Sequence, residues 1–149
     1  MNRPDPDQGF EPVDHTADRA LRVWAPDLES LFLQAARGLA SLLTDPSTVE
    51  RRERRSIELA GIDREELLVA WLGEILYRHD AEHLLLAHFD AVHIECEEER
   101  CSLRAVAFGE ARDPARHSGG TSVKAATYHG LRVVPDEDGR YAVTIVFDA

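Results

Sequence analysis

Two stretches with helical periodicity, each next to strand-like segments, constrain the fold of this chain more than any other feature. In the first, apolar residues recur at three- and four-residue spacing from Leu28 to Leu42 and therefore share one helical face. Asp27 suits the N-cap, because its carboxylate can accept hydrogen bonds from the unpaired amides of the first turn. The pattern predicts an amphipathic helix that begins after Asp27 and ends before Pro46.

The second helical stretch begins with an acidic pair, Asp63 and Glu66, spaced as in a capping box. Apolar residues follow at helical spacing, so we expect a helix to about Tyr77. Beyond it, His79 and His83 stand four residues apart, which is the spacing of two zinc ligands on one helix face. An aspartate rather than a glutamate follows His79, and the chain then enters an apolar run, so a zinc site is not favoured.

The rest of the chain is rich in strand-like segments. RALRVWAP, from Arg19, and VERRERRSIELAG, from Val49, alternate between apolar and polar residues, the second as an edge strand with a solvated face. After the second helix we expect strands in HLLLAHF, AVHIEC, SLRAVAFGE, SVKAATYH, LRVVP and YAVTIVFDA, with a tight turn of positive φ at Gly139. This order predicts an α+β fold in which two helices pack on a largely antiparallel or mixed sheet.

The length of 149 residues suits one domain, residues 1–149, with a flexible N-terminal tail over about residues 1–9. No apolar run approaches the roughly 20 residues that span a bilayer, and the N-terminus lacks the order of a secretory signal. We therefore expect a cytoplasmic protein without membrane contact. Cys96 and Cys101 flank EEER and are expected to be neighbours in a hairpin.

The net charge of -11 opposes strong direct binding of nucleic acid, because such binding depends on Lys and Arg displacing counterions from phosphate. It favours a basic protein partner or a divalent cation. Arginines cluster at residues 51–55, but glutamates interrupt the cluster, so ordinary exposed charge is favoured over an RNA site. Motifs that cradle nucleotides or present a nucleophile, such as GxGxxG, GxxxxGK and GxSxG, do not occur.

Three polar motifs stand out: DHTAD near the N-terminus, KAATYHG from Lys124, and FDA at the C-terminus. Asp148 ends an alternating strand pattern, so it is expected to point away from the face that carries Phe147. If Asp18 and Asp148 come together, their repulsion costs stability unless a proton or a cation lies between them. Oxygen ligands favour hard cations, and the loose geometry of calcium fits best. A cap, a turn or a solvated position for each aspartate by itself is the alternative.

The order of DHTAD, DLESLFLQAARGL, DREELLVAWLGEILYRHD, FGE, VKAATYHGLRV and VFDA resembles the archease family along nearly the whole chain. The resemblance implies two helices paired with a sheet in an Hsp33-like topology. It also implies an accessory protein, not itself an enzyme, that activates the GTP-dependent RNA-splicing ligase of the RtcB type. Such a protein promotes ligase guanylylation and multiple turnover in tRNA splicing and RNA repair. A chaperone or specificity modulator of an RNA methyltransferase is the alternative function.

The resemblance further implies a divalent cation held by Asp18, Asp148 and a backbone or terminal oxygen of Ala149. Calcium is the preferred ion, with magnesium or manganese as alternatives. In this reading Asp14 does no more than begin the turn. Arg19 stands where the family commonly has an apolar residue, and it could either weaken cation affinity or point away from the site.

Lys124 is the candidate for contact with the nucleotide or an acidic group of the ligase, because its ammonium acts as a flexible point charge. His15, Tyr128 and His129 are candidates for the surroundings of the site, and a structural role is at least as well supported for His129. A third functional hypothesis is a metal-dependent hydrolase, in which the carboxylates and His15 generate a metal-bound nucleophile. Hydrolases usually need more ligands and a substrate pocket, which makes this hypothesis the weakest.

Overall fold

The computed structural model describes residues 6–14, 19–117, 120 and 122–148. Its strands are β1 (Gly9–Asp14), β2 (Arg19–Ala25), β3 (Glu53–Gly61), β4 (Leu84–Glu97), β5 (Arg100–Ala111), β6 (Ala125–Ala126) and β7 (Tyr141–Asp148). Its α-helices are α1 (Leu28–Leu43) and α2 (Arg64–Glu82), and a 3-10 turn, η1 (Pro46–Thr48), follows α1. Of these elements, β1 is not predicted from the sequence. Pro12 disturbs its pattern, yet β1 is an edge strand, where a proline is tolerated.

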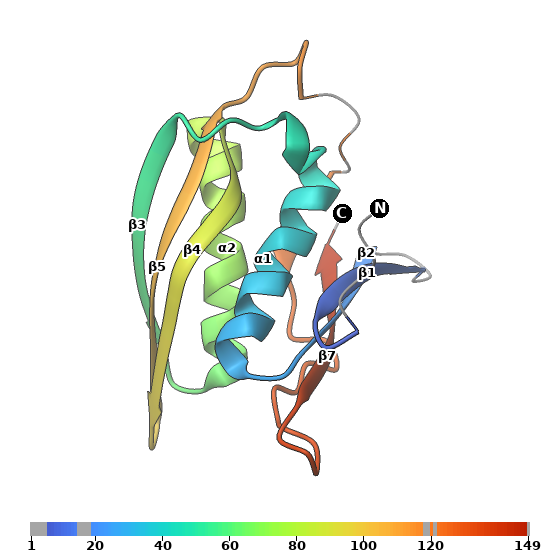
Figure 1. Cartoon of the computed structure of the whole chain (residues 1–149), viewed down its shortest axis with the longest axis vertical. Helices are drawn as coiled ribbons and strands as arrows, with labels where there is room; N and C mark the ends of the chain where they lie inside the picture. The colour runs from blue at the N-terminus through green and yellow to red at the C-terminus, as the bar shows by residue number, and fades with distance from the viewer. Residues whose placement is uncertain (1–5, 15–18, 118–119, 121, 149) are drawn as a thin grey trace.

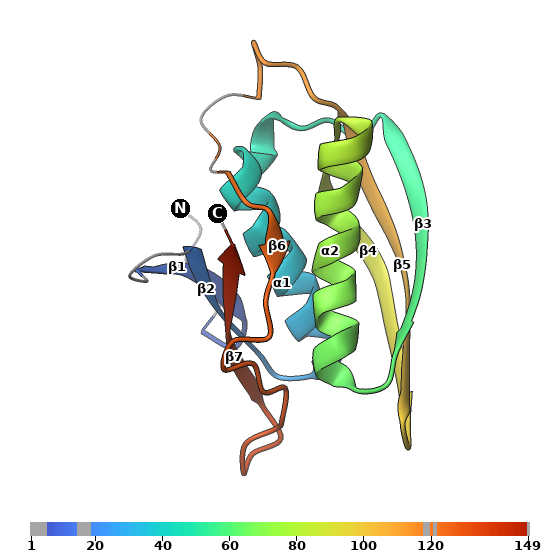
Figure 2. The ribbon, with the colours of Figure 1, turned by 180° about the vertical axis from the view of Figure 1, so that it is seen from behind.

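The two helices lie between two antiparallel sheets (Figures 1 and 2). One sheet has the strand order β3-β5-β4, and the other has the order β1-β2-β7-β6. All pairs of described strands are antiparallel. The predicted α+β class is therefore confirmed, with the difference that the strands divide between two sheets. Both sheets can bury an apolar face because the helix layer between them is apolar on both sides.

The first helix follows the prediction. Asp27 accepts a hydrogen bond from the Ser30 amide at 2.8 Å, and α1 ends at Leu43. In the second, Asp63 accepts from the Glu66 amide at 2.8 Å, while the Glu66 carboxylate reaches back to the amide of Ile62 at 3.2 Å. Both helix starts are therefore local features of the sequence.

The predicted end of the second helix, at about Tyr77, is wrong: α2 continues to Glu82. Arg78 supports the extra turn through ion pairs with Glu74 at 2.9 Å and Glu82 at 3.0 Å. His83 then leaves the helix in the left-handed conformation, with φ 54°, and its amide donates to the carbonyl of Arg78. Because His83 is not helical, the helix-face argument for a zinc pair with His79 does not apply.

The later strands differ from the prediction in extent. HLLLAHF and AVHIEC form one strand, β4, with register shifts between Leu86 and His88 and between Asp90 and His93. SVKAATYH contributes only the two-residue β6, and LRVVP is no strand. Its residue Val133 is buried, and its amide donates to the Glu65 carboxylate at 2.8 Å, so a side chain of α2 takes the place of a strand partner.

Two predicted turns are confirmed. Cys96 and Cys101 are paired residues of the β4–β5 hairpin, 4.1 Å apart at Cα, and are joined by a disulfide. Gly139 has a φ of 79°, and its amide donates to the Asp136 carbonyl at 3.0 Å.

The core lies between the helix layer and the two sheets. Trp71 of α2 is fully buried, and its indole N–H donates to the carbonyl of Phe32 in α1 at 2.9 Å. Its ring meets that of Phe89 in β4 edge to face, with ring centroids 5.6 Å apart. In the part of the chain that the structure describes, no helix is long and apolar enough to cross a membrane.

Candidate functional site

Described parts of the three polar motifs meet at one end of the four-stranded sheet. Asp14, the last residue of β1, pairs with Arg19, the first residue of β2. Arg19 pairs in turn with Phe147 of β7, and Asp148 pairs with Ala125 of β6. Strand register thus brings the end of β1, the start of β2, the end of β7 and the KAATYHG segment to the same sheet end.

Asp148 is exposed, whereas Phe147 is fully buried, which confirms that the two side chains point to opposite faces. The backbone amide of Lys124 donates to the Asp148 carbonyl at 2.9 Å, and the Lys124 side chain is exposed. The chain contains no other lysine. The backbone of Lys124 is therefore held beside the end of β7, and the side chains of Lys124 and Asp148 both reach solvent.

Three of the predicted site residues, Asp18, His15 and Ala149, lie outside the described residues. Among the described predicted residues, the structure brings Lys124 and Asp148 together. Arg19 is exposed at the start of β2.

Tyr128 and His129 lie further along the chain than Ala125, the partner of Asp148. Both side chains are exposed. Partial burial raises the pKa of Tyr128, and the nearby carboxylates of Glu66 and Asp63 raise it further. Their placement around a cation stays a prediction.

Sequence reasoning missed Thr127, the residue that ties KAATYHG to β7. Its amide and its hydroxyl both donate to the Val146 carbonyl at 2.9 Å, and its hydroxyl accepts from the His129 amide at 3.3 Å. A threonine inside a predicted strand gives no sign of this double contact, because its partner is a backbone atom far along the chain. The contact fixes the segment that carries Lys124.

The arginine cluster at residues 51–55 is largely paired with carboxylates. Arg51 meets Asp90 at 3.1 Å, and Arg52 meets Glu50 at 2.6 Å and Glu110 at 3.4 Å. This arrangement is the ordinary exposed charge that the sequence favours.

Glu110 is the centre of a buried polar network at the end of β5. One carboxylate oxygen accepts from the Glu50 amide at 2.7 Å and from the Nε2 of His117 at 3.2 Å, and the other pairs with Arg116. The Nδ1 of His117 accepts from the Asp113 amide at 2.9 Å, so the ring proton lies on Nε2. The Glu50 amide lowers the pKa of Glu110 to about 2 against the opposing effect of burial, and Arg116 and His117 add to the lowering. This network anchors the loop that leads towards Lys124.

Fold and site together define a class: a small α+β protein with a helix pair between two antiparallel sheets, whose polar end combines the first hairpin, the last strand and a lysine-bearing segment. Within that class, residues 10–149 match the model of the Archease protein family.

Relatives agree with this match over nearly the full length. The chain is 44% identical to protein archease of Methanopyrus kandleri over 139 residues, which cover 93% of this chain and 98% of the relative. It is 39% identical to protein archease of Aeropyrum pernix over 140 residues, 94% of this chain and 96% of the relative. The solution structure of Methanobacterium thermoautotrophicum protein 1598 superposes with a TM-score of 0.78 at 34% identity, covering 95% of this chain and 99% of that one. The chain belongs to the archease family.

Proposed function

We propose that this protein is a metal-binding accessory factor that activates a GTP-dependent RNA-splicing ligase of the RtcB type. It promotes guanylylation of the ligase and multiple turnover in tRNA splicing and RNA repair, and it has no ligase activity of its own. Membership of the archease family supports the proposal. The observation that carries it is the polar sheet end, where the Lys124 amide contacts the Asp148 carbonyl at 2.9 Å and both side chains are exposed.

The proposed cation ligands are Asp18, Asp148 and an oxygen of Ala149. Two facts support them. Arg19 and Phe147 are register partners, and each is the sequence neighbour of one of the two aspartates. The donor set consists of oxygen atoms only, which suits calcium, with magnesium or manganese as alternatives. When bound, the cation would supply a fixed positive charge between the carboxylates.

Lys124 has a separate part in the proposal. The Lys124 side chain is exposed. The backbone of its segment is tied to β7 by Thr127, whose hydroxyl donates to the Val146 carbonyl. A lysine of this kind can meet either a phosphate of the ligase-bound nucleotide or a carboxylate of the ligase. We expect it to act on the ligase by charge.

Reconstitution with the RtcB-type ligase of the same genome tests the function. Single-turnover guanylylation and multiple-turnover ligation are measured with no accessory protein, with wild type, and with Asp148→Asn, Lys124→Ala and Lys124→Arg. We expect wild type to raise turnover, Asp148→Asn and Lys124→Ala to lose most of the increase, and Lys124→Arg to keep part of it. Asp138→Asn, an exposed aspartate in the turn before β7, is the matched control and should activate like wild type.

Unchanged ligase turnover with wild type would refute the activator role. Full activation by Asp148→Asn would refute the role of the polar sheet end. Phosphatase or nuclease activity in ligase-free protein would support the hydrolase hypothesis instead, and co-purification with an RNA methyltransferase without any effect on the ligase would support the chaperone hypothesis.

The metal site has its own test, which does not depend on activity. Calorimetric titration of the metal-free protein with calcium should show one site, and Asp148→Asn should weaken it at least tenfold, because replacing even an outer-shell partner of a metal ligand costs about 10- to 100-fold in affinity. Asp138→Asn should bind calcium like wild type. Equal affinity in all three proteins would place the cation elsewhere.

A further inference from the structure

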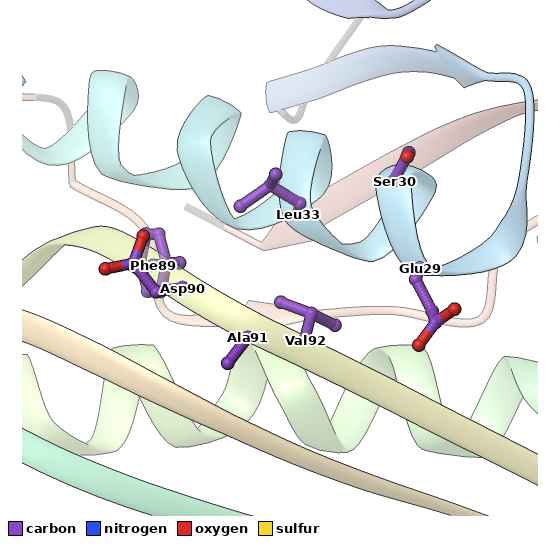
Figure 3. A pocket seen from close by; sticks show the side chains of 7 residues that line it. All are labelled: Glu29, Ser30, Leu33, Phe89, Asp90, Ala91 and Val92. Carbon is purple, nitrogen blue, oxygen red and sulfur yellow. The ribbon is translucent and has the colours of Figure 1, made fainter.

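A hollow lies between α1 and β4, which is an edge strand among the strands that the structure describes (Figure 3). Its volume is about 330 Å³. Leu33 of α1 and Phe89 and Val92 of β4 form its apolar floor. Glu29 and Asp90 stand at its opposite ends, with Leu33 and Val92 between them (Figure 3). We call it the α1–β4 hollow.

An irregularity of β4 shapes the hollow. The register with β5 shifts between Asp90 and His93, so the two residues between them have no Cα partner on β5. One of them, Ala91, has a φ of 53°, a left-handed conformation that costs a non-glycine residue roughly 1 to 2 kcal/mol. Bulges of this type redirect side chains. Here the redirected segment carries Asp90 and Val92 into the wall of the hollow.

The two carboxylates of the hollow are accessible. Glu29 accepts from the Ile94 amide at 3.2 Å and lies 3.4 Å from a ring nitrogen of His93, with 45% of its side chain exposed. Asp90 pairs with Arg51 at 3.1 Å, and both side chains are at least half exposed. Exposed ion pairs of this kind contribute little to the free energy of folding, so a competing cation can replace Arg51 at Asp90 at a small cost in free energy.

An apolar floor between two carboxylates complements an arginine or lysine side chain, which has an aliphatic stem and a cationic head. The net charge of the protein, -11, attracts basic partners in the same way. We propose that the α1–β4 hollow receives a basic side chain of a partner protein, with the stem on Leu33 and Val92 and the cationic head at Asp90, where it replaces Arg51.

This docking site goes beyond the proposed ligase function and does not depend on it. The hollow adjoins the first turns of α1, away from the end of β7 that carries Asp148 (Figure 1). A partner held at the hollow would therefore leave the polar sheet end free. Among the strands that the structure describes, none pairs with the outer edge of β4, so none blocks the approach of such a partner.

NMR titration of the full chain with two peptides tests the proposal. One probe is acetyl-Gly-Arg-Gly-amide, and the other carries citrulline in place of arginine, which keeps the shape and removes the charge. We expect the arginine peptide to shift the methyl signals of Leu33 and Val92 in a saturable manner, with at least fivefold tighter binding than the citrulline peptide. Added salt should weaken the binding of the arginine peptide and leave the binding of the citrulline peptide unchanged.

Variants locate the binding. Asp90→Asn should lower the affinity for the arginine peptide about two- to fivefold, as expected for the loss of one partly exposed charge. The affinity for the citrulline peptide should not change. Glu95→Gln, on the same strand but outside the hollow, is the matched control and should change neither. Equal binding of the two peptides would overturn the proposal, as would equal effects of the two variants. Concentration-dependent dimerisation that buries the same methyl groups would overturn it too, in favour of a second copy of this chain as the occupant.

Discussion

The same substitution, glycine to alanine, should have opposite effects at two positions of this fold. Gly109 lies in β5, the central strand of the three-stranded sheet, and pairs with Leu86 of β4. A methyl group there would stand 2.6 Å from the carbonyl carbon of Leu85 and 2.9 Å from the Cα of Leu86, and would press directly on the Leu85 carbonyl oxygen. These are backbone atoms of a paired strand, so no side-chain rotation relieves the overlap.

Gly73 provides the contrast. It lies inside α2, and a methyl group there would meet no atom within 4 Å. Alanine in a helix interior is more favourable than glycine by roughly 0.5 to 1 kcal/mol, because glycine loses more backbone freedom on folding. Overpacking of a dense interior costs roughly 1 to 3 kcal/mol and occasionally more, and a backbone clash belongs at the upper end. We therefore expect Gly73→Ala to raise the free energy of unfolding by up to about 1 kcal/mol. We expect Gly109→Ala to lower it by about 3 kcal/mol or more.

Urea unfolding followed by far-UV circular dichroism measures both free energies, and thermal unfolding gives a second reading. For a chain of this size 1 kcal/mol corresponds to a shift of about 2 to 4 °C in Tm, so the two variants should differ by roughly 8 °C or more. A Gly109→Ala variant within about 0.5 kcal/mol of wild type, the usual range of a neutral surface change, would refute the reasoning. It would mean that the bulge in β4 absorbs the methyl group.

Three further predictions concern single local contacts. The pKa of Glu110 is about 2 in the folded protein against an ordinary 4.5, so its contribution to stability is complete above about pH 4.5 and is lost as the pH falls towards 2; urea midpoints should fall more steeply across that range in wild type than in Glu110→Gln. Asp27→Ala removes the bond to the Ser30 amide and should cost about 0.5 to 2 kcal/mol of unfolding free energy, whereas Asp27→Asn, which can still cap, should cost less than half of that; equal losses would contradict capping. His83→Gly should raise Tm slightly, because glycine accepts the left-handed φ of 54° without penalty, and a lower Tm would show that the imidazole itself stabilises the helix end.

Much of the fold is predictable because its signals are local. The caps at Asp27 and Asp63 bind amides three residues away, and a side-chain period of two places Phe147 inside and Asp148 outside. The two wrong predictions, the end of α2 and the strand at LRVVP, have a different origin. The end of α2 depends on Arg78 bridging two turns, and the loop at Val133 is buried through a carboxylate 68 residues away, so neither follows from a periodic pattern.

The candidate site is also predictable from the sequence only in part. The motifs that contain Asp18, Lys124 and Asp148 are visible in the sequence, but for each aspartate by itself the residue pattern favours a cap, a turn or a solvated position over a cation ligand. The described register adds that Lys124 binds the backbone of Asp148. It also shows that Thr127 holds the same segment through the carbonyl of Val146, a contact without a sequence signature.

The two helices and their starts, the alternation of the last strand, the cysteine hairpin and the family motifs all follow from local patterns along the chain. The division of the strands into two sheets, the bulge beside the α1–β4 hollow, the burial of Glu110 with His117 and the contact between the backbones of Lys124 and Asp148 depend on the folded chain. The two groups differ in the sequence distance over which their interactions act. Periodicity and capping act within a few residues, whereas sheet register and the pairing of buried charges depend on residues that come together only when distant segments pack.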